Sequence, residues 1–332
     1  MNVRKSLRVA IINNTRPTSH YGCLMVMKNL ETLLKQQGVE VLWTWPVSVD
    51  WRTHKEMLFA MPKVDAVIVN GEGTIHHGPR RWQAQALAEF ADYAHNVLHL
   101  PAFLINTTLY ANEDSLYEYI KRFNRIYVRD RSSFETLQTK QIESQYVPDM
   151  TFALKPNSNY QPSKELLVVD SVMQTDVPKL KEFSKKNQAD YCSMIVARPS
   201  NYSFWKRPRR FLIEIFKWAV NEKKRSLNPS DFEAQLATYR LIVTGRYHTV
   251  TMCLKNRIPF VALESNTPKI SFLLKEVFGD THRVISSDKL ESLEFNEWNS
   301  FSKAELLAID LFIEKAINMN AKMIEEIVND ID

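Results

Sequence analysis

An arginine and a histidine stand one residue apart after an apolar run in LIVTGRYHTV, residues 241–250. Val250 and Leu254 follow at helical spacing, so we expect a helix to begin directly after Gly245. A helix N-terminus offers backbone N–H groups to anions, and an arginine adds a bidentate fork for carboxylate or phosphate. Arg246 and His248 are therefore predicted to form an anion site. A core histidine beside a surface arginine is the alternative.

A second potential anion site follows the next apolar run, in ALESNTPKISFLLKE. Pro268 suits the first turn of a helix, and Asn266 or Thr267 would cap that helix. Ser265 precedes this turn and Lys269 stands inside it. We predict that Ser265, Asn266 and Lys269 join the same anion site. The alternative is a well-capped helix without a ligand.

A turn with two glycines ends another apolar run, in VIVNGEGTIHHG. The chain has only seven glycines, and Gly71 and Gly73 flank Glu72 here. Glycine lets the backbone turn tightly and approach a ligand closely. Asn70, Gly71 and Gly73 are therefore predicted to line a cleft, with Glu72 as a titratable group at its mouth. A tight strand-to-helix turn is the alternative.

No metal site is expected from the histidines and cysteines. His76 and His77 are sequential, so on a helix they cannot point to the same place. The three cysteines lie far apart and no pair of them has metal-ligand spacing. An odd number of cysteines also argues against a disulfide framework.

Arg129 and Asp130 end a further run in IYVRDRSSFETL. Arg129 is a candidate anion ligand; a structural Arg129–Asp130 pair or a solvated rim is the alternative. Ser132 or Ser133 is expected to cap the helix that follows.

The elements that must position these residues alternate between short apolar runs and amphipathic stretches. Strands are predicted at 8–12, 39–43, 64–70, 101–106 and 125–130, and, after a polar stretch at 154–164, at 165–170, 192–198, 240–245 and 259–264. Such alternation predicts α/β units with parallel sheets, and 332 residues are enough for two such domains facing a cleft. In open parallel sheets, ligands bind outside the carboxyl ends of the strands.

The bulk properties are those of an ordinary globular protein. The formal charge of +5 suits an anionic small substrate or an anionic membrane surface and is too small to argue for nucleic acid. We find no apolar run near the roughly 18 residues that span a bilayer, and the apolar start is too short for a signal peptide. A cytoplasmic protein is expected.

One stretch, NYSFWKRPRRFLIEIFKW (residues 201–218), mixes aromatic and basic residues. It could rest on an anionic membrane, line an acceptor cleft with rings under sugar, or pack into the core.

Taken in order, the pieces NGEGTIHH, LINTTLY, VRDRSSFETL with VPDMTFAL, and TGRYHTV through ESNTPKISFLLKE resemble the polysaccharide pyruvyl transferase family. The resemblance extends from Gly22 to about Leu274, and the Arg-any-His turn followed by Ser-Asn-Thr-Pro-Lys is its most specific part. It implies an α/β fold similar to GT-B glycosyltransferases, with two Rossmann-like domains facing a cleft and a last helix crossing back to the first domain. The implied domains are residues 1–158 on the acceptor side, 159–300 on the donor side, and the helix at 301–332.

Members of that family move a pyruvyl group from phosphoenolpyruvate onto two sugar hydroxyls, which makes a cyclic ketal and releases phosphate. By position, Arg246 and His248 match the donor-binding pair, Arg129 the arginine of the RD segment, and Glu72 the acid of the glycine turn. His248 would bond the phosphate or act as general acid, and Glu72 or His76 would be the base. The co-substrate is phosphoenolpyruvate, with no cofactor or metal.

The acceptor implied by the resemblance is a sugar or glycan, for which a lipid-linked form and contact with the inner face of the membrane are options. Gly22, the single glycine of the early loop NNTRPTSHYGC, is assigned to the acceptor side or the cleft. Two rival functions stay open. One is a nucleotide-sugar glycosyltransferase of the same architecture, in which Glu264 would bond ribose hydroxyls. The other is a non-catalytic relative that binds a glycan or phosphate.

Overall fold

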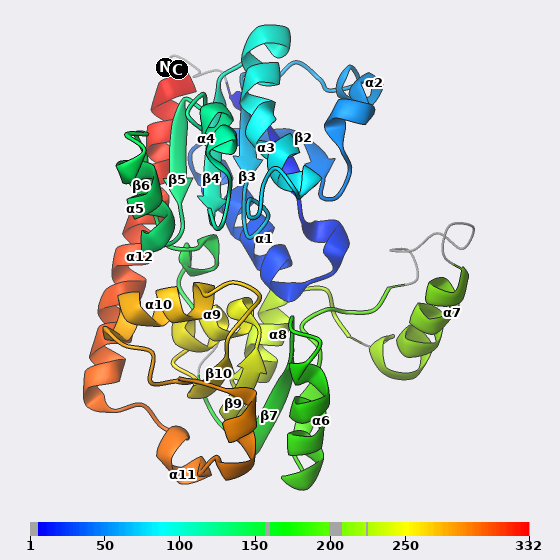
Figure 1. Cartoon of the computed structure of the whole chain (residues 1–332), viewed down its shortest axis with the longest axis vertical. Helices are drawn as coiled ribbons and strands as arrows, with labels where there is room; N and C mark the ends of the chain where they lie inside the picture. Colours follow the sequence, from blue (N-terminus) through cyan, green and yellow to red (C-terminus); the bar gives the residue numbers. More distant parts are fainter. Residues whose placement is uncertain (1–5, 157–159, 199–207, 224, 332) are drawn as a thin grey trace. The chain divides into compact units, whose positions relative to one another are not determined.

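The computed structural model describes residues 6–156, 160–198, 208–223 and 225–331, and the chain divides into two compact units (Figure 1). Unit 1 comprises Met1–Thr15, Met27–Ala153 and Ala316–Asp332, and unit 2 comprises Arg16–Val26 and Leu154–Lys315. The predicted domain boundary at residue 158 lies outside the described residues. Part of the early loop, with Gly22, thus belongs to unit 2.

Unit 1 is built on a parallel sheet of six strands in the order β2-β1-β3-β4-β5-β6. The strands are β1 (Leu7–Asn14), β2 (Val39–Pro46), β3 (Ala66–Asn70), β4 (Ala102–Thr107), β5 (Arg125–Val128) and β6 (Gln145–Tyr146). All five strands predicted for this half are confirmed, with ends that differ by a few residues. Parallel strands are buried on both faces, so they read as nearly continuous apolar runs, and β3 and β4 are buried throughout.

The helices of unit 1 alternate with its strands, as βαβ units require. They are the part of α1 (Tyr21–Gln36) from Met27 onward, α2 (Lys55–Leu58), α3 (Trp82–Tyr93), α4 (Asp114–Ile120), α5 (Arg131–Thr139) and the end of α12 (Lys303–Ile331). The end of α12 packs beside β5, where the hydroxyl of Tyr127 donates to Glu326 at 2.9 Å. The N-cap of α5 is Asp130, whose carboxylate accepts from the Ser133 amide, so the prediction of a serine cap was wrong.

Unit 2 contains a second parallel sheet, with five strands in the order β11-β10-β9-β7-β8. They are β7 (Lys164–Ser171), β8 (Asp190–Cys192), β9 (Tyr239–Gly245), β10 (Phe260–Leu263) and β11 (Val284–Ile285). The strand predicted at 192–198 is wrong, because β8 ends at Cys192. Its apolar residues Met194 and Val196 are buried, and their backbone bonds go to Tyr21 and Ser19.

The helices of unit 2 are α6 (Asp176–Lys186), α7 (Pro208–Lys217), α8 (Pro229–Leu236), α9 (Tyr247–Lys255), α10 (Lys269–Phe278), α11 (Phe295–Trp298) and the first part of α12. The first turns of α1 also belong here. Tyr21 stacks on Phe232 of α8 with ring centroids 4.3 Å apart and donates to the Ser226 carbonyl at 2.7 Å. Those contacts fix the start of α1 against α8 and the loop before it.

Candidate anion-binding site

Neighbouring strands β7 and β9 end side by side and bring Asp170 next to Arg246. Ser171 lies opposite Gly245 in the sheet, and a Cβ on Gly245 would lie 2.3 Å from the Ser171 hydroxyl. The absence of a side chain there lets the two strand ends approach. Arg246 forms a bidentate pair with Asp170, with Nε to Oδ1 at 2.9 Å and Nη2 to Oδ2 at 2.6 Å.

The Asp170 carboxylate is held from a second side. It accepts from the Ser193 hydroxyl at 2.8 Å and from the Met194 amide at 3.0 Å. It therefore fixes one edge of the Arg246 guanidinium, while the edge that carries Nη1 is not used by this carboxylate. The sequence analysis missed Asp170. Its position at the carboxyl end of a predicted strand, the same signal that marked Arg246, could have identified it.

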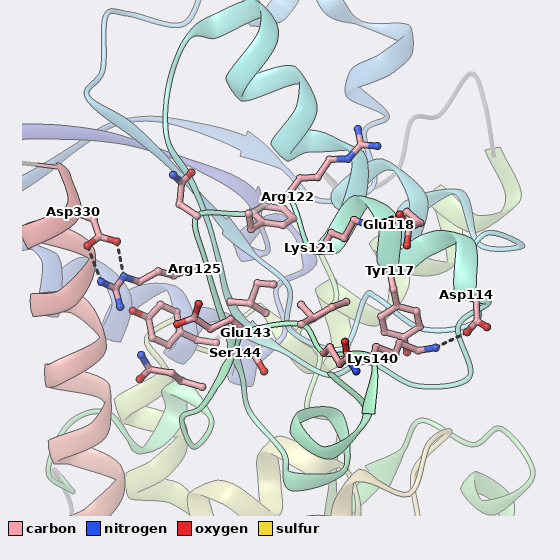
Figure 2. Close-up of a pocket in the computed structure, with 17 residues that line it drawn as sticks. Asp114, Tyr117, Glu118, Lys121, Arg122, Arg125, Lys140, Glu143, Ser144 and Asp330 are labelled. Carbon is pink, nitrogen blue, oxygen red and sulfur yellow. Dashed lines mark hydrogen bonds and ion pairs between the residues drawn. The ribbon is translucent and has the colours of Figure 1, made fainter. Parts of the chain in front are cut away.

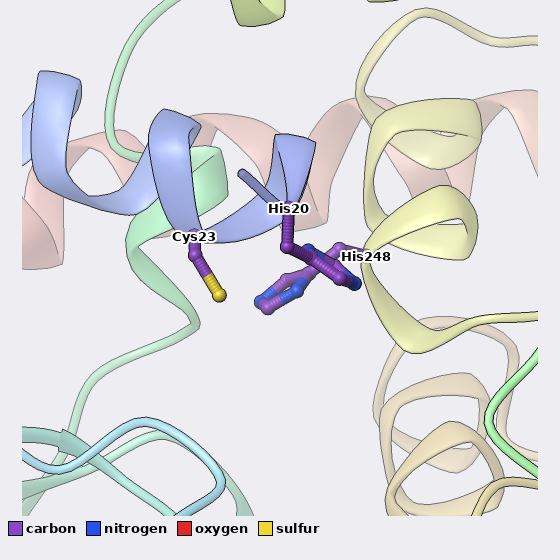
Figure 3. A group of neighbouring side chains, drawn as sticks. All are labelled: His20, Cys23 and His248. Atoms are coloured by element: carbon purple, nitrogen blue, oxygen red, sulfur yellow. The ribbon is translucent and has the colours of Figure 1, made fainter. Parts of the chain in front are cut away.

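His248 lies in the first turn of α9, 8% exposed, as the prediction of a helix start after Gly245 requires. The ring of His20, just before α1, stands edge-on to it at 5.4 Å between centroids (Figure 3). Gly22 permits this arrangement, because a Cβ there would lie 2.1 Å from Cγ of His248. The structure thus places Gly22 against a predicted donor-binding residue.

The Gly22 amide donates to Nδ1 of His20 at 3.1 Å, which assigns the proton of the neutral ring to Nε2. Burial lowers the pKa of His20 well below its usual 6.5, and the charges of His248, Arg246 and Lys269 lower it further. His20 is therefore neutral near pH 7 and presents an N–H donor. The effect of these three side chains on the pKa indicates that the electrostatic potential at His20 is positive, which favours the binding of an anion.

The start of α10 differs from the prediction. The carboxylate of Glu264 accepts from the amides of Ser265 at 2.8 Å and Ser271 at 3.1 Å, and from the amide of Ile270 at 3.3 Å. An internal anion thus occupies the N–H groups that were expected to bind a ligand. Neither Asn266 nor Thr267 caps this helix through its side chain. Glu264 takes that role because its two oxygens reach three amides.

Lys269 nevertheless contributes its charge to the site. Its ammonium lies 5.8 Å from the ring centroid of Tyr247, the residue between Arg246 and His248. It also lies 3.3 Å from Oδ1 of Asn266, which accepts in turn from the Ser265 hydroxyl. Lys269 is thus held beside the start of α9. Asn266 contacts its ammonium, and Ser265 in turn donates to Asn266.

His20, Cys23 and His248 form the one group among the described residues whose donor atoms could hold a metal ion, all within 4.8 Å of one another (Figure 3). Nitrogen and sulfur donors in this number suit an ion such as zinc. Two observations weigh against a cation. The nearby charges of Arg246 and Lys269 raise the potential at His20, and Nδ1 of His20 already accepts the Gly22 amide. We therefore interpret the group as part of an anion site.

In unit 1, the glycine turn after β3 holds a buried carboxylate. Glu72 has a left-handed backbone with φ of 40° and is 4% exposed. Its Oε1 accepts from Thr15 at 2.5 Å and from Asn70 at 2.9 Å. Gly71 is required by close approach, since a Cβ there would lie 2.3 Å from Cβ of Thr107. No helix follows at once, because α3 begins at Trp82, so the alternative of a strand-to-helix turn is wrong.

His76 is held by its neighbours in the same loop. Its Nδ1 lies 2.7 Å from Nδ1 of His77, and its Nε2 contacts Arg81. Thr74 follows Gly73, and its hydroxyl accepts from the side-chain amide of Asn13 at 3.5 Å, which holds the turn against β1. The roles of Glu72 and His76 as a base stay predictions.

Arg129 forms a buried ion pair with Asp149. It donates to Asp149 at 2.7 Å and to the Thr108 hydroxyl at 2.8 Å, and the side chains of Arg129 and Asp149 are 2% and 0% exposed. Asp149 comes from VPDMTFAL, one of the segments that carried the resemblance. This arrangement is a buried structural ion pair of unit 1, and donor binding by Arg129 stays a prediction.

Unit 1 also contains a cavity of about 990 Å³ lined largely by charged side chains (Figure 2). It lies at the amino ends of β5 and β6, where Arg125 donates to Asp330 at 2.8 Å. Ligands of parallel sheets bind at the opposite, carboxyl ends. None of the described residues predicted for the site lines this cavity, so we do not assign the site to it.

Comparison with known families identifies the family to which the chain belongs. The family described as polysaccharide pyruvyl transferase matches residues 20–267. The chain belongs to the polysaccharide pyruvyl transferase family. The match begins at His20 and includes Arg246 and His248, so it covers most of the cluster described above. No protein of curated function gave a significant sequence match.

Solved structures share the fold at low sequence identity. A putative UDP-N-acetylglucosamine 2-epimerase from Listeria monocytogenes has 10% identity and a TM-score of 0.56, covering 96% of this chain and 94% of its own. The UDP-GlcNAc 2-epimerase of Methanocaldococcus jannaschii has 13% identity and a TM-score of 0.53, covering 93% and 100%. A functionally uncharacterised protein from Klebsiella pneumoniae has 12% identity and a TM-score of 0.51, covering 85% and 92%. These similarities confirm the predicted GT-B-like class with two parallel-sheet domains, and at such identities they show the fold alone.

Proposed function

We propose that this family member transfers a pyruvyl group from phosphoenolpyruvate to two hydroxyls of a glycan, forming a cyclic ketal. The observation that carries the proposal is the gathering of His20, Arg246, His248 and Lys269 in unit 2. Phosphoenolpyruvate presents a carboxylate and a phosphate on a small carbon frame. Arginine forks, helix starts and imidazole N–H groups are the groups that bind such anions.

The transfer balances without an oxidant or a cofactor. The methylene carbon of the donor accepts a proton, and C2 becomes electrophilic. One sugar hydroxyl attacks C2 and loses its proton, and the second hydroxyl then displaces phosphate. Of the two protons that the hydroxyls lose, one ends in the new methyl group and the other leaves with the phosphate.

The surroundings of each residue in unit 2 indicate its role in the proposed reaction. Asp170 orients the Arg246 fork, whose remaining edge would bind an oxyanion of the donor. His20, neutral with its proton on Nε2, would donate to a phosphate oxygen. His248 would bond the phosphate or deliver the proton to the methylene carbon. Glu72 or His76 of unit 1 is proposed as the base for the sugar hydroxyl.

A nucleotide-sugar glycosyltransferase is the rival suggested by the fold. In that alternative Glu264 would bond the ribose hydroxyls. The Glu264 carboxylate instead accepts three backbone amides at the start of α10. Using it for ribose would leave those amides unsatisfied, so this geometry favours the pyruvyl donor.

The test is mass spectrometry of candidate acceptor glycans incubated with phosphoenolpyruvate. We expect the acceptor to gain one pyruvyl unit less water, with one phosphate released for each unit transferred. Turnover with nucleotide sugars instead would establish the rival activity. Binding of phosphoenolpyruvate without turnover on any acceptor would indicate a non-catalytic relative.

Arg246→Gln provides the residue-level test. Losing one charge-assisted contact in a site of this kind should raise the activation barrier by about 2–4 kcal/mol. Arg240→Gln, on the same strand but half exposed beside Glu165, is the matched control and should keep wild-type kcat/KM. Circular dichroism melting confirms that both variants fold. A folded Arg246→Gln variant with unchanged kcat/KM would remove Arg246 from the mechanism.

A further inference from the structure

Helix α7 carries an exposed apolar stripe that continues into the turn after it. Leu212, Ile213, Phe216 and Val220 are 58%, 45%, 70% and 60% exposed. Their spacing puts them along one side of the helix. Single exposed apolar residues are ordinary, but four of them in a row along a helix form an interaction surface.

The opposite side of α7 is distinct from this stripe. Phe211, Ile215 and Trp218 are half-buried there, and the ammonium of Lys223 lies 5.8 Å from the Trp218 ring centroid. The stripe is therefore a separate surface of the helix. The part of the aromatic and basic stretch at 201–207 lies outside the described residues.

Positive charge is concentrated in the part of the sequence that contains this helix. Arg209 and Arg210 are exposed in its first turn. Between residues 198 and 225 the sequence contains nine lysines and arginines and two glutamates, whereas the whole chain carries only +5. The rest of the chain therefore has a slight negative charge, and the basic excess of the protein belongs to this segment.

We propose that α7 binds the surface of a bilayer with anionic headgroups. A helix with an apolar stripe beside arginines can lie in a membrane interface. Its apolar side chains then enter the boundary of the acyl chains, and its arginines contact the phosphates of the headgroups. Among the described residues no helix is both long and apolar enough to span a bilayer. The inference goes beyond the proposed transfer reaction and does not depend on it.

Vesicle flotation without donor or acceptor tests this proposal. The wild type should float with phosphatidylcholine vesicles that contain phosphatidylglycerol, and not with phosphatidylcholine alone, and high salt should weaken the binding. The double variant Leu212→Gln/Phe216→Gln should lose at least about tenfold in vesicle affinity, because two large apolar side chains no longer enter the interface. Arg209→Gln/Arg210→Gln should lose affinity for the anionic vesicles and part of its salt dependence.

The matched control is Leu307→Gln/Leu311→Gln on α12, where the two leucines are also one turn apart and 62% and 60% exposed. This variant should float like the wild type, and melting curves should show that all variants fold. Equal loss of binding by the control would overturn the proposal. A wild type that does not float with anionic vesicles would overturn it as well. A concentration-dependent dimer in sedimentation that Leu212→Gln/Phe216→Gln abolishes, with no vesicle binding, would assign the stripe to a second copy of the chain instead.

Discussion

Gly22→Ala sets two effects of known sign against each other. Replacing a helical glycine by alanine ordinarily stabilises a protein by about 1 kcal/mol. Here the new Cβ would lie 2.1 Å from Cγ and Nδ1 of His248 and 2.3 Å from its Cβ. Overfilling a packed site costs about 1–3 kcal/mol. The cost should lie toward the upper end, since the obstructing atoms are the rigid root of a buried ring. We expect a net loss of about 1–2 kcal/mol.

Urea unfolding followed by circular dichroism measures that loss, and a double-mutant cycle with His248→Gly locates its cause. Glycine is needed in the second position because an alanine would retain the clashing Cβ. Without His248, Gly22→Ala should be neutral or stabilising, so the coupling between the two sites should reach at least about 1 kcal/mol. Gly38→Ala adds a Cβ with no atom within 4 Å, so any cost there comes from the strain of the left-handed backbone, with φ of 74°, and not from a clash.

The close packing of Gly22 on His248 also predicts that Gly22→Ala weakens ligand binding. A displaced His248 ring should weaken binding of inorganic phosphate or phosphoenolpyruvate in Gly22→Ala, while Gly38→Ala should bind both like the wild type. Our reasoning about the start of α1 would be refuted by a Gly22→Ala protein as stable as the wild type. An equal cost in the presence and absence of His248 would refute it as well.

Three further predictions concern ionisable side chains. Asp149→Asn leaves the Arg129 charge buried without its partner and should cost about 3–5 kcal/mol in urea unfolding, whereas Glu118→Gln in an exposed pair should change stability by about 0–1 kcal/mol. The folded-state pKa of His20 is lowered, so the unfolded chain binds its proton first and stability should fall as pH drops below about 6.5. His20→Gln should lack that part of the pH dependence in the same assay, and an unchanged slope would contradict the assignment. Glu264→Gln loses a carboxylate at the start of α10 and should lower the urea midpoint by the equivalent of about 0.5–2 kcal/mol, with no effect on the affinity for nucleotide sugars.

Most of the fold could be predicted because parallel sheets leave a strong signal. Strands buried on both faces read as apolar runs, and β1, β3, β4 and β9 were found that way. The run at 192–198 has the same composition but is not a strand. Its apolar side chains are buried in a loop whose backbone pairs with residues 19–21, a contact between distant parts of the chain that no local pattern reveals.

The site was predictable only where its residues stand at strand ends. Arg246 and His248 follow β9 directly, so local sequence was enough to find them. His20 was missed because it reaches the site through the packing of Gly22 on His248, which depends on tertiary structure. Glu264 was a candidate ribose ligand only for the rival glycosyltransferase, and the sequence does not show that its carboxylate accepts from the amides that follow it.

The charges of the site support a small anion over a metal or a neutral ligand. Asp170 offsets the charge of Arg246 and holds its fork in one orientation, so this pair contributes geometry more than net charge. The net positive charge then comes from Lys269. Burial and the neighbouring cations lower the pKa of His20, and an anion bound among these cations would offset their part of the shift and favour the protonated ring. Under the proposed function, anion binding would thus be coupled to proton uptake at His20, and the proposed reaction, which protonates a methylene carbon and releases phosphate, would need both at one place.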